Sequence, residues 1–355
     1  MKLADIRFFP YTIPFKVPFS TAAGTIWNRS GWIIQLEDRE GRVGQGEWAP
    51  LPGWSPDAAE VNPDQLEAVA ARLKQADQDL ESALTQIMGD LHAKPALCFA
   101  LETAVTDLAA QAAGYPLYRY IRSDASPTVL INAIVPAGPL DQVMDAAVRR
   151  YDEGYRTLKL KIRGPEDEAL LSALRERLGT EFSIRLDANG AWDVPTAIKI
   201  LRKFEAYDIE YVEQPTDPLD YDALGRVRAE VSIPVAADEL VTDRSSVKRM
   251  VEDGSVDVVV LKPMIQGGIR ACLDMARLAE AGNVKVVLTT TLDAIIGRTA
   301  TAHLAAACST PGMANGLATG SFLQADLAKD PLRIKNGTIT LAAVPGLGLS
   351  RIAAQ

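Results

Sequence analysis

Five ionisable residues stand at the ends of consecutive short apolar runs, where a buried strand would otherwise carry apolar side chains. They are Lys161, Asp187, Glu213, Asp238 and Lys262, spaced 24 to 26 residues apart. One strand followed by one helix takes about that much chain, so each side chain falls at the carboxyl end of its strand. In a parallel β/α barrel these ends build the active site, so we expect the five side chains to meet there.

The three carboxylates, Asp187, Glu213 and Asp238, indicate a metal site. Carboxylates that converge from neighbouring strands repel one another and cannot all stay ionised unless a cation lies among them. Oxygen ligands favour Mg²⁺ or Mn²⁺ over zinc, and the sequence contains only two histidines, His92 and His303. We therefore expect a Mg²⁺ site, with Mn²⁺ as the other candidate, whose open positions bind a substrate carboxylate.

The lysines on either side of the carboxylates suit proton abstraction from the carbon next to a bound carboxylate. A lysine that acts as a base near neutral pH needs a pKa about three units below its usual value, or about 4 kcal/mol. Lys159 precedes Lys161 by two residues, so both side chains leave one face of the strand, where neighbouring positive charge lowers the pKa. We assign Lys161 as the base, Lys159 as an electrostatic helper, and Lys262 to the opposite side of the barrel mouth.

The elements that would position these residues divide the chain into three parts. Residues 1–123 show strand-like alternation and then helical periodicity, which predicts an α+β capping domain. Residues 124–321 alternate short apolar runs with amphipathic stretches and end at GLATG, which predicts a (β/α)7β barrel of the TIM type. Residues 322–355 contain a hairpin pattern, and we expect them to return to the cap. A doubly wound open sheet is the alternative, although no GxGxxG or GxxxxGK motif follows any of the runs.

Composition restricts the class of function. The net charge is -9 and the pI is about 5.0, without a long run of Lys or Arg, so we expect no nucleic-acid and no membrane partner. Cys98, Cys272 and Cys308 lie far apart and fit neither a disulfide framework nor a metal clip, which suits a reducing compartment. We see no signal-peptide pattern and no apolar run of about 20 residues, and expect a cytoplasmic protein with a small-molecule carboxylate substrate. The sequence leaves a homo-oligomer open.

The motifs around the five residues resemble a known family. They read KLK at Lys159 to Lys161, LDANGAW around Asp187, VEQP at Glu213, ADE at Asp238 and LKP at Lys262. In this order they are similar to the muconate-lactonizing subgroup of the enolase superfamily, and the resemblance extends over nearly the whole chain. It implies a barrel with a capping domain, a bound Mg²⁺ and lysine acid–base chemistry through an enediolate.

Within the subgroup, the cap stretch GEWAPLPGWSPD, the run LINAIV and the stretch GLATG resemble the o-succinylbenzoate synthases. That resemblance implies a carbon–oxygen lyase, which dehydrates 2-succinyl-6-hydroxy-2,4-cyclohexadiene-1-carboxylate in menaquinone biosynthesis. The alternatives are an N-acylamino acid racemase, a dipeptide epimerase and a muconate-type cycloisomerase. Dipeptide epimerases carry Asp-x-Asp after the last strand, whereas Ala318 and Gly320 stand here and disfavour a cationic substrate. A barrel retained only for binding is the non-enzymatic alternative.

Further residues are expected to contact the substrate or to orient the metal ligands. The set comprises Asn132, Asn189, Glu239, Thr290, Thr291, Asp293 and Gly320. Relatives tend to carry Glu and Ser where this chain has Asp293 and Ala294. We interpret His303 as a helix-packing residue and expect a tryptophan of the cap loops, Trp27, Trp48 or Trp54, to close over the substrate.

Overall fold

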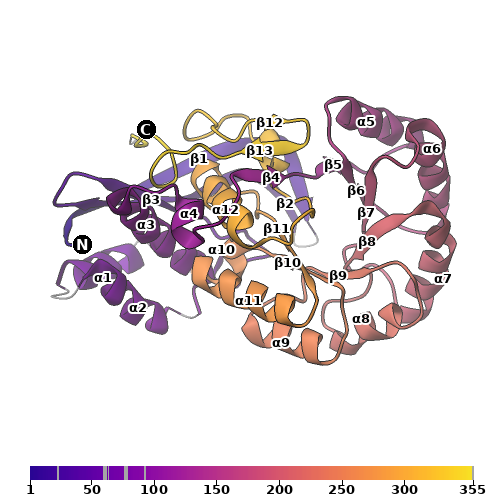
Figure 1. The fold of residues 1–355 in the computed structure, drawn as a ribbon, viewed down its shortest axis with the longest axis horizontal. Coiled ribbons are helices and arrows are strands. Elements are labelled where there is room, and N and C mark those ends of the chain that lie inside the picture. The colour runs from indigo at the N-terminus through magenta and orange to yellow at the C-terminus, as the bar shows by residue number, and fades with distance from the viewer. Residues whose placement is uncertain (22–23, 59–61, 63, 76–78, 92, 354–355) are drawn as a thin grey trace.

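The computed structural model describes residues 1–21, 24–58, 62, 64–75, 79–91 and 93–353. Figure 1 shows a smaller unit built from the first part of the chain beside a curled sheet covered by helices, and both chain ends lie at the side of the smaller unit. The expected α/β barrel with an α+β cap is therefore confirmed. His92 lies outside the described residues.

The cap consists of an antiparallel sheet packed against helices. Its strands pair in the order β1 (Leu3–Thr21), β2 (Gly24–Asp38) and β3 (Val43–Trp48). Its helices are α1 (Asp64–Gln75), α2 (Leu80–Asp90), α3 (Pro95–Ala113) and α4 (Leu117–Ile121). Helix α3 lies so close to β3 that a Cβ atom at Gly44 or Gly46 would overlap the carbonyl oxygens of α3. Glycine at these two positions therefore permits the tight helix–sheet contact.

Helix α3 is the one described helix long and apolar enough to cross a membrane. Its most apolar window of 18 residues is 78% buried within the protein. It packs against the sheet of the cap, so we interpret it as a core helix. The sequence analysis expected no apolar run of about 20 residues. Helix α3, with 19 residues, comes close to that length.

The barrel contains a parallel sheet of seven strands, all of which lie in the described part of the chain. In chain order the strands are β5 (Ala133–Val135), β6 (Thr157–Lys161), β7 (Ser183–Asp187), β8 (Ile209–Glu213), β9 (Val235–Ala237), β10 (Val258–Leu261) and β11 (Lys285–Leu288). Each strand pairs with the next along the chain, which is the neighbour order of a singly wound barrel. The sheet is thus curled rather than doubly wound.

Helices cover the outside of this sheet (Figure 1). They are α5 (Leu140–Asp152), α6 (Glu168–Leu178), α7 (Val194–Phe204), α8 (Tyr221–Arg228), α9 (Arg244–Glu252), α10 (Pro263–Gln266), α11 (Ile269–Ala281) and α12 (Ile295–Cys308). Short 3₁₀ turns are η2 (Pro165–Asp167), η3 (Glu205–Tyr207) and η4 (Ala318–Phe322). Asp193, Asp220 and Asp243 begin α7, α8 and α9, because each side chain accepts hydrogen bonds from backbone N–H groups of the first turn.

The barrel closes through two residues rather than through a full eighth strand. Asn315 bridges to Ile131, and Gly316 bridges to Thr289, which follows β11. The stretch GLATG, expected as the last strand, continues as a loop and the turn η4. Likewise the single strand expected at VLINAIV is divided into β4 (Thr128–Leu130) and β5, since Ile131 pairs with the closing segment instead.

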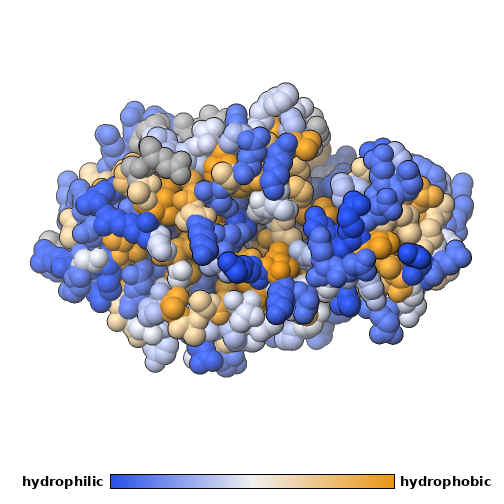
Figure 2. Space-filling view, turned by 90° about the horizontal axis from the view of Figure 1, so that it is seen from above, coloured by the Kyte–Doolittle hydropathy of each residue, from blue (hydrophilic) through white to orange (hydrophobic). Residues whose placement is uncertain are grey.

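The last residues form the expected hairpin, β12 (Ile334–Lys335) and β13 (Thr338–Thr340). Strand β13 pairs with β4 and not with the sheet of the cap. Beyond the hairpin the chain reaches the cap, where the Ile352 carbonyl accepts a hydrogen bond from Gln35 and its N–H donates to Gln45. Figure 2, a view from above, shows a largely hydrophilic face with small apolar patches between the polar side chains.

Candidate active site

The strand register places the ionisable residues at one rim of the barrel. Lys161 of β6 lies beside Asp187 of β7, and Asp187 lies beside Glu213 of β8. Asp238 and Lys262 each follow the last residue of the next two strands, β9 and β10. Because all these strands run parallel, the five side chains leave the sheet at its carboxyl edge, as their spacing in the sequence predicts.

Lys159 lies between two of the carboxylates. Its Nζ atom donates to Glu213 Oε1 at 2.6 Å and lies 3.0 Å from Asp187 Oδ2. Burial by itself would lower the pKa of this lysine, but the negative charges of Asp187, Glu213 and Asp238 outweigh burial and hold the pKa well above its ordinary value. Lys159 therefore remains charged in this arrangement, which suits an electrostatic role.

The other two lysines lie at opposite ends of the carboxylate row. Lys161 Nζ is 3.3 Å from Asp187 Oδ2 and donates to the side chain of Asn189, with 43% of the Lys161 side chain exposed. Lys262 pairs with Asp238, and its side chain is only 9% exposed. A carbon bound between them could thus exchange a proton from either side, with Lys161 on the open side.

The carboxylates are nearly enclosed by protein, and their chemistry fits a hard divalent cation. Burial, followed by the charges of Asp187 and Asp238, raises the pKa of Glu213 to about 8, so negative charge is poorly tolerated there unless a cation compensates it. No three His, Cys, Asp or Glu side chains among the described residues converge closely enough to hold a metal ion as they stand. The reason is visible in the contacts, since lysine ammonium groups occupy the space between the carboxylates.

A cavity of about 140 Å³ opens beside these residues. The barrel supplies its floor, with Lys159, Lys161, Asp187, Asp238 and Lys262. The cap supplies apolar walls through the side chains of Phe19, Leu51 and Trp54. The cavity thus joins a charged floor to an apolar cover made by a different part of the chain.

One buried network joins the cap to the loop after β11. Arg29 of β2 donates to the Leu292 carbonyl at 3.0 Å, and its guanidinium lies 3.7 Å from Asp293 Oδ1. Leu292 has a φ of 62°, a left-handed conformation that is rare for a bulky residue and needs support from its surroundings. Arg29 therefore helps to hold the wall of the cavity that Leu292 forms.

Glu47 of β3 completes this network at the start of α12. Its carboxylate accepts hydrogen bonds from the N–H groups of Ala294 and Gly297, each at 2.8 Å, and from the hydroxyl of Tyr11 at 2.5 Å. The residue before α12, Ala294, has no side chain that could cap the helix. Glu47, a residue of the first domain, therefore satisfies N–H groups at the N-terminus of a barrel helix.

Comparison with known proteins assigns the chain to a family. A model of the enolase C-terminal domain-like family matches residues 142–351. The chain belongs to the enolase superfamily. A second model, of the MenC N-terminal domain, matches residues 3–108, so the resemblance recognised from the strand-end motifs is confirmed in both parts of the molecule.

Individual relatives within the superfamily have different activities. The o-succinylbenzoate synthase of Thermobifida fusca is 39% identical over 223 residues, which cover 61% of this chain and 68% of that protein. The hydrophobic dipeptide epimerase of Enterococcus faecalis is 30% identical over 311 residues, covering 86% of this chain and 88% of that one. The crystal structure of the dipeptide epimerase from Enterococcus faecalis complexed with Mg and the dipeptide L-Leu-L-Tyr superimposes with a TM-score of 0.88 at 28% identity, over 99% of this chain and 100% of that one.

The structure brings part of the expected contact set to the cavity of this superfamily member. Asn189, Thr290 and Thr291 line it. The Thr290 hydroxyl shares a hydrogen bond of 2.7 Å with Thr319, and Asn189 links Lys161 to Glu239 through its two side-chain atoms. Glu239 is not among the described lining residues of the cavity, and its carboxylate accepts the hydrogen bond from Asn189.

Three other expected contacts lie away from this cavity. Asn132 is buried inside the barrel, where its side chain meets Arg185 Nη1 at 3.5 Å, because the expected first strand breaks at this point. Asp293 turns into the cap interface toward Arg29. Gly320 lies against the guanidinium of Arg298, in the turn that replaces the expected last strand. These three residues therefore lie outside the described lining of this cavity, and their contact with a substrate stays a prediction.

Gln214 supports the candidate site but was left out by the sequence analysis, although it follows Glu213 in the quoted VEQP motif. Its φ is 41°, and its side-chain oxygen accepts hydrogen bonds from the N–H groups of Asp238 and Leu240, at 3.1 and 3.3 Å. Gln214 thus fixes the backbone that carries Asp238. The apolar residue types of Phe19 and Leu51 gave no indication that they line the cavity.

Proposed function

We propose that the protein is an o-succinylbenzoate synthase that dehydrates 2-succinyl-6-hydroxy-2,4-cyclohexadiene-1-carboxylate for menaquinone biosynthesis in the cytoplasm. The observation that carries the proposal is the chemistry of the cavity. Its described lining contains no carboxylate apart from Asp187 and Asp238, which belong to the proposed metal site. The ammonium group of a dipeptide would therefore lack a counter-ion, whereas the apolar walls suit a carbocyclic ring.

Two comparisons add support from sequence. The match to the MenC N-terminal domain covers the part of the chain that supplies the apolar walls. The synthase from Thermobifida fusca has 39% identity, against 30% for the epimerase from Enterococcus faecalis, although the epimerase match is longer.

The side chains divide the reaction between them. Asp187, Glu213 and Asp238 would hold a Mg²⁺ ion, which when bound supplies Lewis-acid polarisation of the substrate carboxylate. Lys161, as the base, removes the proton from the ring carbon next to the carboxylate. The carbon–oxygen bond to the ring hydroxyl then breaks, and Lys161 returns its proton so that the hydroxyl leaves as water. Lys159 and Lys262 oppose the negative charge that builds up between these steps.

The test is turnover of the cyclohexadiene substrate by the purified protein with Mg²⁺. We expect conversion to o-succinylbenzoate, a loss of at least 1000-fold in kcat for Lys161→Ala, and loss of activity when EDTA removes the metal. Lys285→Ala, at an exposed position at the start of β11, is the matched lysine control and should retain activity. A metal-loaded protein that leaves this substrate unchanged refutes the proposal.

Racemisation of N-acylamino acids is a second candidate, because Lys161 and Lys262 flank the carboxylate row from opposite ends. A racemase needs a proton carrier on each face of the α-carbon. Incubation of N-succinylamino acids in deuterated water decides the point, since a racemase incorporates deuterium from both enantiomers. In that case Lys161→Ala and Lys262→Ala should each retain exchange with only one enantiomer.

A further inference from the structure

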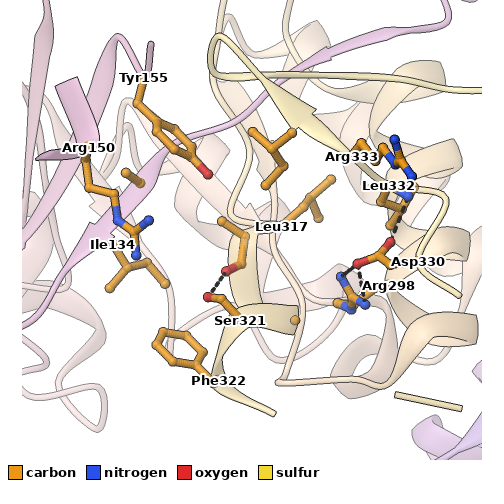
Figure 3. A pocket seen from close by; sticks show the side chains of 14 residues that line it. Ile134, Arg150, Tyr155, Arg298, Leu317, Ser321, Phe322, Asp330, Leu332 and Arg333 are labelled. Carbon is orange, nitrogen blue, oxygen red and sulfur yellow. Dashed lines mark hydrogen bonds and ion pairs between the residues drawn. The ribbon is translucent and has the colours of Figure 1, made fainter. Parts of the chain in front are cut away.

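A second cavity, of about 480 Å³, lies next to the active cavity. The two cavities share Ile134 of β5 and Phe322 of η4 as wall residues. Figure 3 shows these two side chains on the same side of the second cavity, together with Arg150. The two cavities therefore meet at these two apolar side chains.

Positive groups predominate among the described lining residues. Three arginines, Arg150, Arg298 and Arg333, face a single carboxylate, that of Asp330. Such a surplus is notable in a protein with a net charge of -9, because a concave positive site concentrates anions. The lining therefore favours an anionic ligand.

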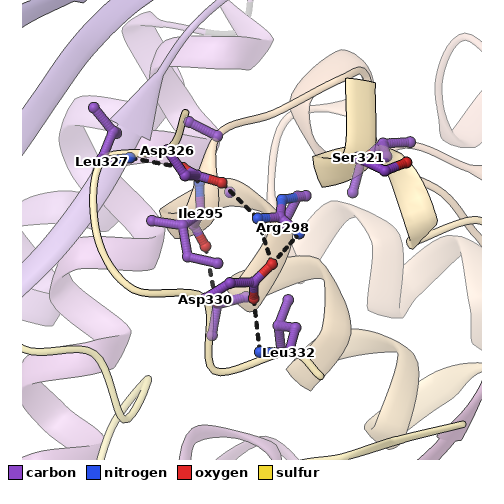
Figure 4. A network of polar contacts seen from close by, with 12 residues as sticks. Ile295, Arg298, Ser321, Asp326, Leu327, Asp330 and Leu332 are labelled. Carbon is purple, nitrogen blue, oxygen red and sulfur yellow. Dashed lines mark hydrogen bonds and ion pairs between the residues drawn. The ribbon is translucent and has the colours of Figure 1, made fainter. Parts of the chain in front are cut away.

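The arginines of the cavity differ in how far neighbouring carboxylates neutralise their charge. Arg298 is buried and binds both Asp326 and Asp330, at 2.5 and 3.0 Å, as Figure 4 shows. Two carboxylates compensate this guanidinium, so it serves to hold the C-terminal segment against α12. The end of the cavity near Arg298 and Arg333 is therefore almost balanced in charge.

Arg150 provides the available charge at the other end. Among the residues that the structure describes, its ion-pair partner is Glu153, at 2.8 Å, and both of these side chains are well exposed, so water weakens the pair. Tyr155 lies on the same turn, since its N–H donates to the Arg150 carbonyl. Figure 3 shows the Tyr155 ring reaching into the cavity beside Arg150, and no hydrogen bond of its hydroxyl is found among the described residues.

We propose that Arg150 and Tyr155 form a binding site for the carboxylate group of an organic acid, whose apolar part packs on Ile134, Leu317 and Phe322. A guanidinium and a phenol hydroxyl are both donors to carboxylate oxygens. The carboxylate comes either from the far end of a molecule bound in the active cavity or from a separate acid. The first source rests on the proposed function, because the substrate of that reaction carries a succinyl carboxylate; the second source is independent of it.

Three ligands distinguish the sources when binding is measured by titration calorimetry with Mg²⁺ present. They are o-succinylbenzoate, 2-butanoylbenzoate, in which a methyl group replaces the distal carboxylate, and succinate. If the distal carboxylate occupies the site, the wild type binds o-succinylbenzoate at least about fivefold more tightly than its analogue, and Arg150→Gln and Tyr155→Phe reduce this ratio. If a separate acid occupies it, succinate binds to protein saturated with the analogue, and the same variants weaken that binding.

Arg149→Gln is the matched control, because Arg149 is exposed on the same helical turn but does not line the cavity. It should leave all three dissociation constants unchanged. The proposal is overturned if Arg150→Gln and Tyr155→Phe leave both the ratio and the succinate affinity unaltered, or if Arg149→Gln has the same effect. The measurement requires no turnover, so a failed synthase assay with intact succinate binding would reject the proposed function and leave this site standing.

Discussion

Trp54 of the cap lies over the ammonium group of Lys262 of the barrel, with 5.0 Å between Nζ and the centre of the indole ring. The contact links the apolar cover of the cavity to one of its charged groups. A cation held against an aromatic face gains about 0.5 to 2 kcal/mol, depending on how far water is excluded. The pair thus combines closure of the cavity with the positioning of a lysine.

Replacing Trp54 should lower catalysis more than stability. We expect Trp54→Ala to reduce kcat/KM about tenfold, because the lysine loses its aromatic support and water enters, while Trp54→Phe should retain most of the activity. Steady-state kinetics measures the effect, with Trp27→Ala, an exposed tryptophan outside the cavity, as control. Equal losses in the alanine and phenylalanine variants would contradict a role for the ring face.

Mg²⁺ should stabilise the folded protein through the carboxylate row. At a metal concentration of 100 times its Kd, we expect the free energy of unfolding to rise by about 2.7 kcal/mol. Glu213→Gln should abolish most of that increase, because an amide binds the ion more weakly than a carboxylate does. Thermal unfolding with Mg²⁺ or EDTA provides the measurement, and Glu230→Gln, an exposed residue, is the control. An undiminished metal effect in Glu213→Gln would place the ion elsewhere.

His303 should make stability depend on pH. Burial lowers its pKa to about 4, and its Nδ1 atom accepts a hydrogen bond from the Tyr118 N–H, which protonation would remove. The unfolded chain has a histidine pKa near 6.5, so the folded state binds fewer protons and loses stability as the pH falls from 6.5 toward 4. Urea unfolding at pH 5.5 should show a loss of about 1.4 kcal/mol in the free energy of unfolding. His303→Gln, compared at pH 7.5 and 5.5, should lack this component.

Arg29 and Asp293 should prove coupled in a double-mutant cycle. Arg29→Met leaves a buried carboxylate without its cation and should cost about 3 kcal/mol of unfolding free energy. Asp293→Asn removes that charge, so the double variant should be less destabilised than the sum of the two single variants. Urea unfolding gives the energies, and the KM of Asp293→Asn should stay near that of the wild type. A large rise in KM would return Asp293 to the substrate contacts.

The sequence predicted the rim of the barrel well because one rule governs it. Consecutive parallel strands repeat their geometry, so equal spacing along the chain becomes adjacency in space, as the pairing of Lys161, Asp187 and Glu213 shows. The same rule failed where the repeat itself is interrupted. Asn132 and Gly320 flank the closure of the barrel, where short bridges replace regular strands and the direction of a side chain no longer follows from its position.

The cover of the cavity was predictable only in outline. Trp54 was one of three candidate tryptophans, and the structure places it against Lys262, whereas Trp48 is buried and Trp27 is exposed. Phe19 and Leu51 reach the cavity through the docking of the cap on the barrel. Periodicity describes which face of an element is apolar, but it carries no information about which distant element that face meets.

The hydrogen bonds between Glu47 and the start of α12 limit which parts of this enzyme could be replaced by the same parts of a relative. Because Glu47 satisfies the first N–H groups of a helix in the other half of the molecule, the two halves are not interchangeable modules. A chimera that takes its first hundred residues from another member would inherit an exposed or mismatched helix start unless it also brings an acidic side chain to this place. Recombination between members of the superfamily is thus constrained at the contact between Glu47 and α12. A substitution on one side of this contact requires a compatible residue on the other.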